Sequence, residues 1–445
     1  MTRSLGAKLT SESKFVNAIQ IWGRVSAIHG GIIRVSGLQD FACIGDLVVI
    51  KSNFDVPGEV IAIDQDDVIV IPECAVAGLS PGERVYFARR FLPRPTIEWL
   101  GHIISPNGTL VGGAPAPVGE TEMPLNALPP VSTERRGLGP RLNSGLSVFD
   151  TFLPICRGQR IGIFAGSGVG KSSLLAQLAN NVEADVVIVA LIGERSREVR
   201  EFANDILGAK DSTRKIIVAS DCSESATSKR RGALLAIATA EYFRDLGLHV
   251  LLIFDSITRF ADAHREIALT SGETPSLRAY PPSTFGAIAA LAERTGPGSH
   301  KSGDITAIFS VLVAGSDMEE PIADMTRSIL DGHIVLDRGI AERGRFPAID
   351  IRRSVSRSLP KAANDTENIL IPRARNYLGI YEDAHTNIQT GLYTAGSDKN
   401  IDEAIEINPK LDAFASTLSD CCANSFVQLE NALQIDMQNL ETGQK

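Results

Sequence analysis

Apolar and polar residues alternate in short runs over the first quarter of the chain. The runs are rich in β-branched residues and are separated by turn-forming segments: IIRVSG (32–37), DLVVIKS (46–52), EVIAID (59–64), VIVIPE (68–73) and RVYFA (84–88). Several short strands at this spacing are typical of a small closed β-barrel. We therefore predict a β-barrel over residues 18–95, preceded by an amino-terminal extension over residues 1–17.

The pattern changes after residue 145, where longer apolar runs alternate with amphipathic segments. The expected strands are 160–164, 185–193, 215–220, 249–255 and 305–315. The expected helices begin at residue 171 and cover 196–205 and 233–247. Strands that are apolar throughout are buried on both faces, so this pattern predicts a parallel sheet covered by helices over residues 146–365.

Two further segments complete the predicted organisation. Residues 96–145 are rich in Pro and Gly and are expected to form a connector between the barrel and the sheet. The last eighty or so residues have a helical pattern, with LDAFASTLSD (411–420) and SFVQLENALQ (425–434) as candidate helices. We assign residues 366–445 to a carboxyl-terminal helical domain.

The net charge of −9 gives the chain no overall attraction to nucleic acid or anionic lipid. The barrel segment has acidic turns instead of the aromatic and basic side chains of an oligonucleotide-binding barrel. We therefore expect no nucleic-acid partner and a structural or assembly role for the barrel. No apolar run approaches the length of a membrane span, and MTRSLGAKLTSESK lacks the apolar core of a secretory signal, so a cytoplasmic location is expected.

The stretch FAGSGVGKSS (164–173) lies between an expected strand and an expected helix, which is the context of a phosphate-binding P-loop, or Walker A motif. Glycines let backbone N–H groups converge on phosphate oxygens, and the helix amino terminus adds a partial positive charge. Lys171 is suited to the β- and γ-phosphates, and the Ser172 hydroxyl to Mg²⁺. The predicted nucleotide-binding residues are Ala165, Gly166, Ser167, Gly168, Val169, Gly170, Lys171, Ser172 and Ser173.

Two carboxylates stand at the ends of apolar runs. Asp255 ends HVLLIFD (249–255), where a carboxylate holds Mg²⁺ through water (Walker B), and Glu194 follows DVVIVALIG (185–193). Ligands of open α/β sheets bind at the carboxyl edge of the strands, so both side chains are expected there, with Glu194 polarising the attacking water. Arg195 is expected to contact the γ-phosphate. The alternative is a surface ion pair within the charged run ERSRE (194–198).

Phosphoryl transfer is commonly assisted by an arginine inserted from outside the site. Arg357 in SVSRSL (354–359) is the best candidate, although a lone loop arginine is normally only solvated.

Several motifs together resemble the RecA-like F1-type ATPases in their order and spacing. These are FAGSGVGKSS (164–173), ALIGERSREVREF (190–202), LLIFDSITRFADAHREIAL (251–269), AYPPSTF (279–285), DGHIVLDR (331–338) and RFPAIDIRRSVSR (345–357). The resemblance runs from about Gly23 to beyond Ile405. It implies an α/β fold with a RecA-like P-loop core, an N-terminal β-barrel and a C-terminal helical domain.

The resemblance also assigns roles to two residues outside the P-loop. In that family the SVSR segment carries an arginine finger, which implies that Arg357 reaches into the site of a neighbouring subunit within a hexamer. The family also stacks an aromatic ring on adenine just before the PAID-like segment, which implies this role for Phe346, with core packing as the alternative. ATP and Mg²⁺ are the implied cofactors.

Within the family, the chain looks most similar to the type III export ATPases. REIALTSGETP (265–275) and GLYTAGSDKNIDEAI (391–405) carry this similarity, together with the P-loop sequence. The catalytic subunit of the rotary synthase typically has GGAGVGKT at the P-loop, and the non-catalytic subunit lacks the glutamate that Glu194 supplies. The flagellum-specific branch fits best.

That similarity implies an ATP hydrolase that forms a homohexamer and promotes substrate unfolding, chaperone release and export. The implied partners are the flagellar export gate, stalk and regulator proteins, export chaperones and export substrates, at the inner face of the cytoplasmic membrane. Three alternatives remain open: a virulence type III secretion ATPase, the catalytic subunit of a rotary ATP synthase, and an RNA-dependent ring helicase or terminator.

Overall fold

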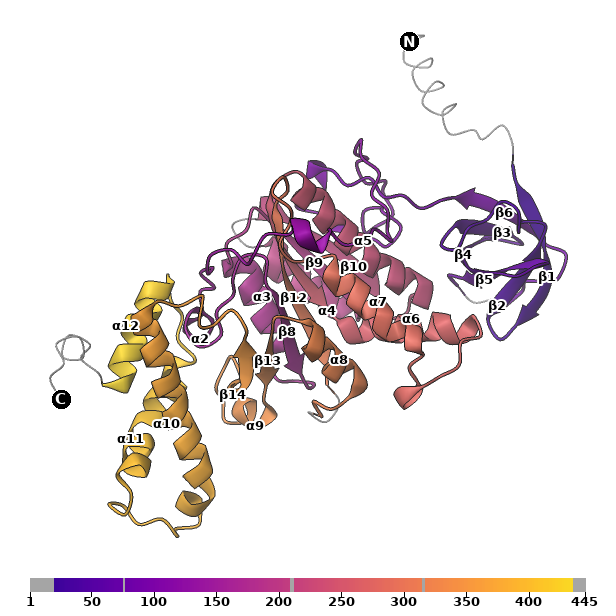
Figure 1. Cartoon of the computed structure of the whole chain (residues 1–445). Coiled ribbons are helices and arrows are strands. Elements are labelled where there is room, and N and C mark those ends of the chain that lie inside the picture. The colour runs from indigo at the N-terminus through magenta and orange to yellow at the C-terminus, as the bar shows by residue number, and fades with distance from the viewer. Residues whose placement is uncertain (1–19, 75–76, 209–211, 314–316, 435–445) are drawn as a thin grey trace. The chain divides into compact units, whose positions relative to one another are not determined.

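The computed structural model describes residues 20–74, 77–208, 212–313 and 317–434 of the 445-residue chain (Figure 1). The expected extension over residues 1–17 lies outside these ranges. The chain folds into two compact units, one built on the barrel as far as Leu92 and the other on the sheet and the helices that follow. Within the described ranges, no helix is both long enough and apolar enough to cross a membrane.

Six strands form the closed barrel, and this confirms the predicted barrel fold. They are β1 (Trp22–His29), β2 (Ile32–Ser36), β3 (Leu47–Lys51), β4 (Asp55–Ile63), β5 (Asp67–Pro72) and β6 (Arg84–Arg89), in the order β1-β2-β5-β4-β3-β6. Alternate side chains point inward, such as Ile33 and Val35 on β2 and Val48 and Ile50 on β3. Strand β1 was not among the five expected runs, and it closes the barrel by pairing with both β2 and β6.

An eight-stranded sheet forms the centre of the second unit. Its strands are β7 (Ile103–Ile104), β8 (Arg160–Ala165), β9 (Val186–Glu194), β10 (Lys215–Asp221), β11 (His249–Asp255), β12 (Asp304–Leu312), β13 (Gly332–Leu336) and β14 (Ile349–Ser356). The order is β14-β13-β8-β12-β11-β9-β10-β7. Only β14 pairs antiparallel, with β13. The predicted parallel sheet is therefore right for its core, and an antiparallel strand lies at one edge.

Helices cover both faces of this sheet, as the apolar strands predict. They are α3 (Lys171–Asn181), α4 (Ser196–Leu207), α5 (Ala226–Asp245), α6 (Ile257–Thr270), α7 (Pro282–Glu293) and α8 (Pro321–Ile329). Along β9, Val187 and Val189 belong to the core that contains α3 and α4. Their neighbours Ile188 and Ala190 belong to the core that contains α5 and α7. Strands β8 to β12 thus supply both cores by alternation.

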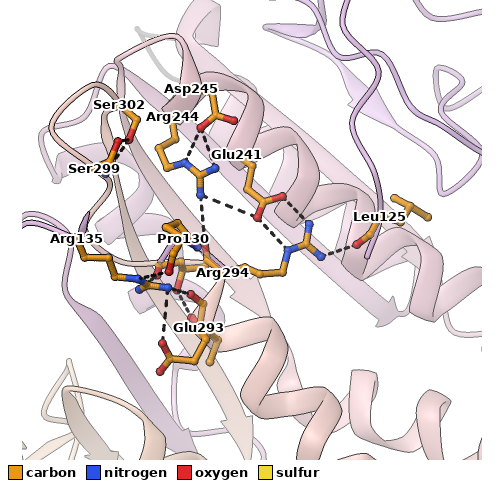
Figure 2. A network of polar contacts seen from close by, with 12 residues as sticks. Leu125, Pro130, Arg135, Glu241, Arg244, Asp245, Glu293, Arg294, Ser299 and Ser302 are labelled. Atoms are coloured by element: carbon orange, nitrogen blue, oxygen red, sulfur yellow. Dashed lines mark hydrogen bonds and ion pairs between the residues drawn. The ribbon is translucent and has the colours of Figure 1, made fainter. Parts of the chain in front are cut away.

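The segment between the barrel and the sheet is tied closely to the second unit. Its residues Ile103 and Ile104 add strand β7 to the sheet by pairing with β10. Arg294, just after α7, donates to the Leu125 carbonyl, and Arg135 donates to the Pro130 carbonyl (Figure 2). Arg135 also donates to the Thr295 carbonyl. These contacts give the Pro- and Gly-rich segment a fixed path.

Three helices end the described chain: α10 (Asp365–Gln389), α11 (Lys399–Phe414) and α12 (Cys422–Leu433). Helix α10 begins at a capping box in which the Asn364 side chain accepts from the Glu367 backbone and the Glu367 side chain accepts from that of Asn364. The expected helix at 411–420 is wrong in its bounds, because α11 ends at Phe414. The expected helix at 425–434 coincides largely with α12.

Candidate active site

A glycine-rich turn joins the end of β8 at Ala165 to the start of α3 at Lys171. Gly168 and Gly170 have φ angles of +77° and +86°, which L side chains rarely adopt. A Cβ atom at Gly170 would also lie 3.1 Å from the ring of Phe346. The local geometry therefore requires glycine at both positions, and it leaves backbone N–H groups at the start of α3 available to an anion.

Phe346 lies beside this turn, in the segment between α9 (Arg338–Glu342) and β14. Its side chain is 52% exposed, so the ring is not part of the core. An exposed ring next to a phosphate-binding turn offers a flat apolar surface to the base of a nucleotide. The structure thus brings together two of the features that the sequence singled out, the P-loop and this aromatic residue.

Lys171 and Asp255 form a buried ion pair at the carboxyl edge of the sheet. The Lys171 Nζ lies 2.5 Å from the Asp255 Oδ1, and the two side chains are only 11% and 4% exposed. The Ser310 hydroxyl donates to the same carboxylate oxygen at 2.5 Å, and its oxygen lies 3.5 Å from the Lys171 Nζ. Because buried charges must be paired, each partner compensates the other until a ligand takes its place.

Sequence reasoning missed Ser310. It is a hydroxyl residue within the apolar run of β12, and β12 is the parallel neighbour of β11, which ends at Asp255. In that register Phe309 lies opposite Phe254, so Ser310 comes next to Asp255. A polar residue near the end of an apolar strand was the only available signal, and it becomes informative once the strand order is known.

Glu194 lines a cavity of about 210 Å³ together with the P-loop residues Ser172 and Ser173 and the Walker B residue Asp255. Burial raises the pKa of the Glu194 carboxyl to about 7, and the negative charge of Asp255 adds to this, while the Lys171 ammonium opposes it. A carboxyl group with a pKa near neutrality can exchange a proton with a bound water molecule. The structure therefore places the P-loop serines, Asp255 and Glu194 around one cavity.

Arg195 is exposed, whereas its neighbour Glu194 is half-buried. It precedes α4, its side chain is 79% exposed, and its Nη1 lies 3.0 Å from the Glu198 Oε1. It does not line the cavity that Glu194 shares with Asp255. This is the surface ion pair of the charged run, the alternative that the sequence left open.

Arg357 lies at the opposite end of the sheet from the P-loop. It follows Ser356, which is paired with Gly332 at the start of β13. The other end of β13, Leu336, is paired with Ala165, where the P-loop begins. Four residue steps along a strand correspond to about 13 Å, and the P-loop extends further still. Arg357 therefore has no place in the cavity of its own chain.

The protein groups at the cavity fit magnesium better than a metal with many protein ligands. Over the described ranges, no group of three or more His, Cys, Asp and Glu side chains is arranged to hold a metal ion. The cavity does offer the Ser172 hydroxyl and the Asp255 carboxylate. Mg²⁺ commonly takes one or two such oxygen ligands and completes its shell with phosphates and water.

Comparison with protein families gives two consecutive matches. Residues 145–356 match the nucleotide-binding domain of the ATP synthase alpha/beta family, and residues 365–417 match the C-terminal domain of the type III secretion ATPase EscN. The chain is 42% identical over 414 residues to the flagellum-specific ATP synthase of Caulobacter vibrioides, with 90% of this chain and 92% of the relative covered. It is 38% identical to that of Salmonella typhimurium, with 93% and 94% covered.

Solved structures show the same architecture. The assembled ATPase EscN of the enteropathogenic Escherichia coli type III secretion system has a TM-score of 0.86 and 36% identity, covering 92% of this chain and 100% of the EscN chain. EscN in complex with its central stalk EscO has a TM-score of 0.81 and 35% identity, with the same coverage. These similarities extend over the barrel, the sheet and the C-terminal helices.

Proposed function

The chain belongs to the flagellum-specific branch of the ATP synthase alpha/beta family, and we propose that it hydrolyses ATP at the subunit interfaces of a homohexamer. The observation that carries this proposal is the separation of Lys171 and Arg357 to opposite ends of one sheet. A chain that holds both halves of a phosphoryl-transfer site so far apart completes the site only by combining with another copy.

One subunit supplies the phosphate cradle. The backbone N–H groups of residues 166–170 and the amino terminus of α3 receive the phosphates, and Phe346 packs against the adenine. Lys171 exchanges the carboxylate of Asp255 for the β- and γ-phosphates. This exchange frees Asp255, which together with the Ser172 hydroxyl would hold Mg²⁺. When bound, Mg²⁺ neutralises the charge that develops on the phosphate oxygens.

Glu194 orients and polarises the water that attacks the γ-phosphorus, and its raised pKa lets it receive a proton at neutral pH. The Ser310 hydroxyl keeps the Asp255 carboxylate in a fixed orientation through their hydrogen bond. Contact of Arg195 with the γ-phosphate requires this side chain to leave its ion pair with Glu198. We therefore rank Arg195 below Glu194 as a contributor to turnover.

The next subunit supplies Arg357 as the arginine finger. Its side chain is exposed and makes one long hydrogen bond, to the Arg327 carbonyl at 3.4 Å, so little holds the guanidinium back. EscN, to which the chain is similar over 92% of its length, is described as an assembled ATPase and also in complex with a central stalk. These descriptions support a ring and a stalk partner for this chain as well.

The relatives named flagellum-specific ATP synthase direct the activity to flagellar protein export. In this role the ring promotes substrate unfolding and release from chaperones at the export gate, bound peripherally at the inner face of the cytoplasmic membrane. The virulence-system alternative has weaker support, because the identity to EscN is 36%, compared with 42% and 38% to the two flagellum-specific relatives. We divide the chain into an extension (1–17), the barrel (18–95), a connector (96–145), the nucleotide-binding domain (146–365) and the C-terminal helical domain (366–445).

The dependence of the ATPase rate on protein concentration tests this proposal. If the site is completed between subunits, the rate per subunit rises steeply over the range in which rings form and then levels off. Size measurements on the same samples report the assembly state, and the purified chain assembles without a second type of subunit. Full activity in a strictly monomeric sample would contradict the proposal.

A further inference from the structure

The side-chain amide of Gln159 is buried and bonds to residues that anchor the backbone of Arg357. Gln159 directly precedes β8 and has no exposed surface. Its amide makes three hydrogen bonds. Its Oε1 accepts from the Cys156 backbone at 2.8 Å. Its Nε2 donates to the Ser356 Oγ at 2.9 Å and to the Asp331 carbonyl at 3.3 Å. A buried amide whose three groups are all satisfied holds its partners in one arrangement.

Two of the three partners of this amide, Asp331 and Ser356, also anchor Arg357. The Asp331 carbonyl accepts the backbone N–H of Arg357 at 2.9 Å as well as the amide of Gln159. Ser356 is the residue directly before Arg357, and its hydroxyl donates to the Pro154 carbonyl at 2.7 Å. The backbone of Arg357 is therefore held from both sides by groups that Gln159 connects.

Asp331 is itself fixed by a fork of hydrogen bonds. The guanidinium of Arg160 donates to both carboxylate oxygens, Nε to Oδ2 at 3.1 Å and Nη2 to Oδ1 at 3.2 Å. The Arg160 backbone also donates to the Oδ2 at 3.0 Å. A bidentate pair of this kind sets direction as well as distance. Asp331 is thus a rigid support, and Gln159 transmits that rigidity to Ser356.

We propose that Gln159 is a positioning residue for Arg357, fixing the direction in which the arginine leaves its own subunit. This inference rests on the proposed function, in which Arg357 acts on the neighbouring site. A misplacement of about 1 Å in a group that stabilises a transition state costs on the order of 10²-fold in rate. The long and exposed side chain of Arg357 has few contacts of its own, so its direction depends on how its backbone is anchored.

Two variants loosen this anchor by different routes. Gln159→Met keeps the length of the side chain and removes the amide, whereas Ser356→Ala removes only the hydroxyl that Gln159 contacts. The matched control is Ser354→Ala, on the same strand. Ser354 is also buried, and its hydroxyl donates to the Asp350 carbonyl and accepts from the Val335 N–H instead. We expect both test variants to lower kcat about tenfold or more while ATP affinity and ring formation stay unchanged, and the control to match the wild type.

Mixed rings separate positioning from a general loss of structure. A Gln159→Met subunit has an intact phosphate cradle, and a Glu194→Gln subunit has an intact, well-anchored Arg357. Mixing Gln159→Met with the inactive Glu194→Gln protein raises the rate per Gln159→Met subunit above that of Gln159→Met alone, at the interfaces that combine these halves. A structural defect confined to the mutant subunit would not respond in this way, so the absence of rescue overturns the proposal.

The result for Arg357→Ala shows which inference fails. If Arg357→Ala is inactive while Gln159→Met and Ser356→Ala have the wild-type kcat, the arginine finger stands and the role of Gln159 is refuted. If Arg357→Ala retains full activity, the proposed interface is wrong, and the role of Gln159 is wrong with it.

Discussion

The ammonium group of Lys171 lies 2.5 Å from the carboxylate of Asp255, so the two charged residues at the P-loop are paired with each other. Each is almost fully buried, and neither charge could stand there alone. Under the proposed function, a triphosphate and Mg²⁺ would replace this one ion pair by two, lysine with phosphate and aspartate with metal. In the proposed function the pair thus prepares the site for both ligands together, and the Asp255→Asn prediction below depends on this arrangement.

Asp255→Asn is expected to make ATP binding insensitive to Mg²⁺. The amide cannot compete for the Lys171 ammonium as a charge, so lysine is free for the phosphates, while the carboxylate that holds the metal is lost. Titration with a fluorescent ATP analogue, with Mg²⁺ and with a chelator, measures this. The wild type loses affinity in the chelator, and the variant changes little. Asp245→Asn removes an exposed carboxylate that pairs with the buried Arg244, and it serves as the control that behaves as the wild type.

Glu194→Gln is expected to abolish turnover and leave ATP binding intact. The substitution keeps the size of the side chain but removes the carboxylate that polarises water, a group that commonly contributes 10²–10⁴-fold. Rapid measurement of ATP hydrolysis and an equilibrium binding assay separate the two effects. Lys171→Ala loses turnover as well, with weakened phosphate binding. Turnover at the wild-type rate in either variant would refute the assigned roles.

The rate of the wild type is expected to fall as the pH is lowered through about 7. The pKa of Glu194 is raised by burial and by the charge of Asp255, so below that pH the carboxyl group is protonated and cannot accept a proton from water. Above it the carboxylate is present and the rate reaches a plateau. A profile of kcat against pH with Mg²⁺ in excess measures the effect. The range from about pH 6 to 8 brackets the raised pKa of about 7. A rate that stays constant over this range would contradict the role of Glu194.

The meeting of the predicted cradle residues at one edge of the sheet could be inferred from the sequence, because its signals are local. The P-loop, Asp255 and Glu194 each follow an apolar strand, and the ends of neighbouring parallel strands meet at one edge. Ser310 and Gln159 were not predicted, because their roles depend on contacts with residues that are distant in the sequence. Gln159 touches Ser356, 197 positions away in the chain. No periodicity in a single sequence reports such a contact.

The prediction of the fold also succeeded where the sequence signal is continuous and failed where it is mixed. The apolar strands of the central sheet were identified, since both of their faces are buried and the pattern is continuous. Strand β1 was missed, because WGRVSAIH mixes apolar and polar residues at a barrel wall with one face in solvent. The helix expected at 411–420 was displaced, because α11 starts at the Asp398 cap and contains Pro409.

Arg357→Ala is expected to bind ATP normally and hydrolyse it 10³–10⁵-fold more slowly, the range typical of arginine fingers. Mixed with Glu194→Gln protein, it regains activity, because each interface between an intact cradle and an intact arginine forms a complete site. The steady-state rate of the mixture, measured at several ratios, is compared with the two parents. Arg353→Ala, at an exposed position on β14, the strand that Arg357 directly follows, is the control and keeps the wild-type rate.

Phe346→Ala is expected to weaken ATP binding by about 1–3 kcal/mol, the usual value of a base stacked on an aromatic ring. Phe346→Tyr keeps the ring and retains most of the affinity. The ring lies over Gly170, so it is placed to cover a base whose phosphates occupy the P-loop. Equal affinities for the alanine and tyrosine variants would show that adenine binds elsewhere.

The buried pair of Glu241 and Arg294 is expected to govern stability and not activity. Both side chains are at most 3% exposed and are joined by two hydrogen bonds, at 3.0 and 2.6 Å (Figure 2). Glu241→Ala leaves the guanidinium buried without its partner, which costs about 3–5 kcal/mol in the free energy of unfolding. Replacing both residues, Glu241→Leu with Arg294→Met, removes both charges and is expected to cost less than the single change.

Urea titration of the second unit measures this difference. Trp99 is buried in that unit, so its fluorescence in a Trp22→Phe background reports unfolding there and not in the barrel. Arg338→Ala breaks an exposed ion pair with Glu342 and leaves the unfolding midpoint unchanged, as a control. If the double variant proved less stable than Glu241→Ala, the pair would owe its contribution to attraction between the charges. We expect the double variant to be more stable than Glu241→Ala, because the main cost of the single change is the unpaired charge of the buried Arg294.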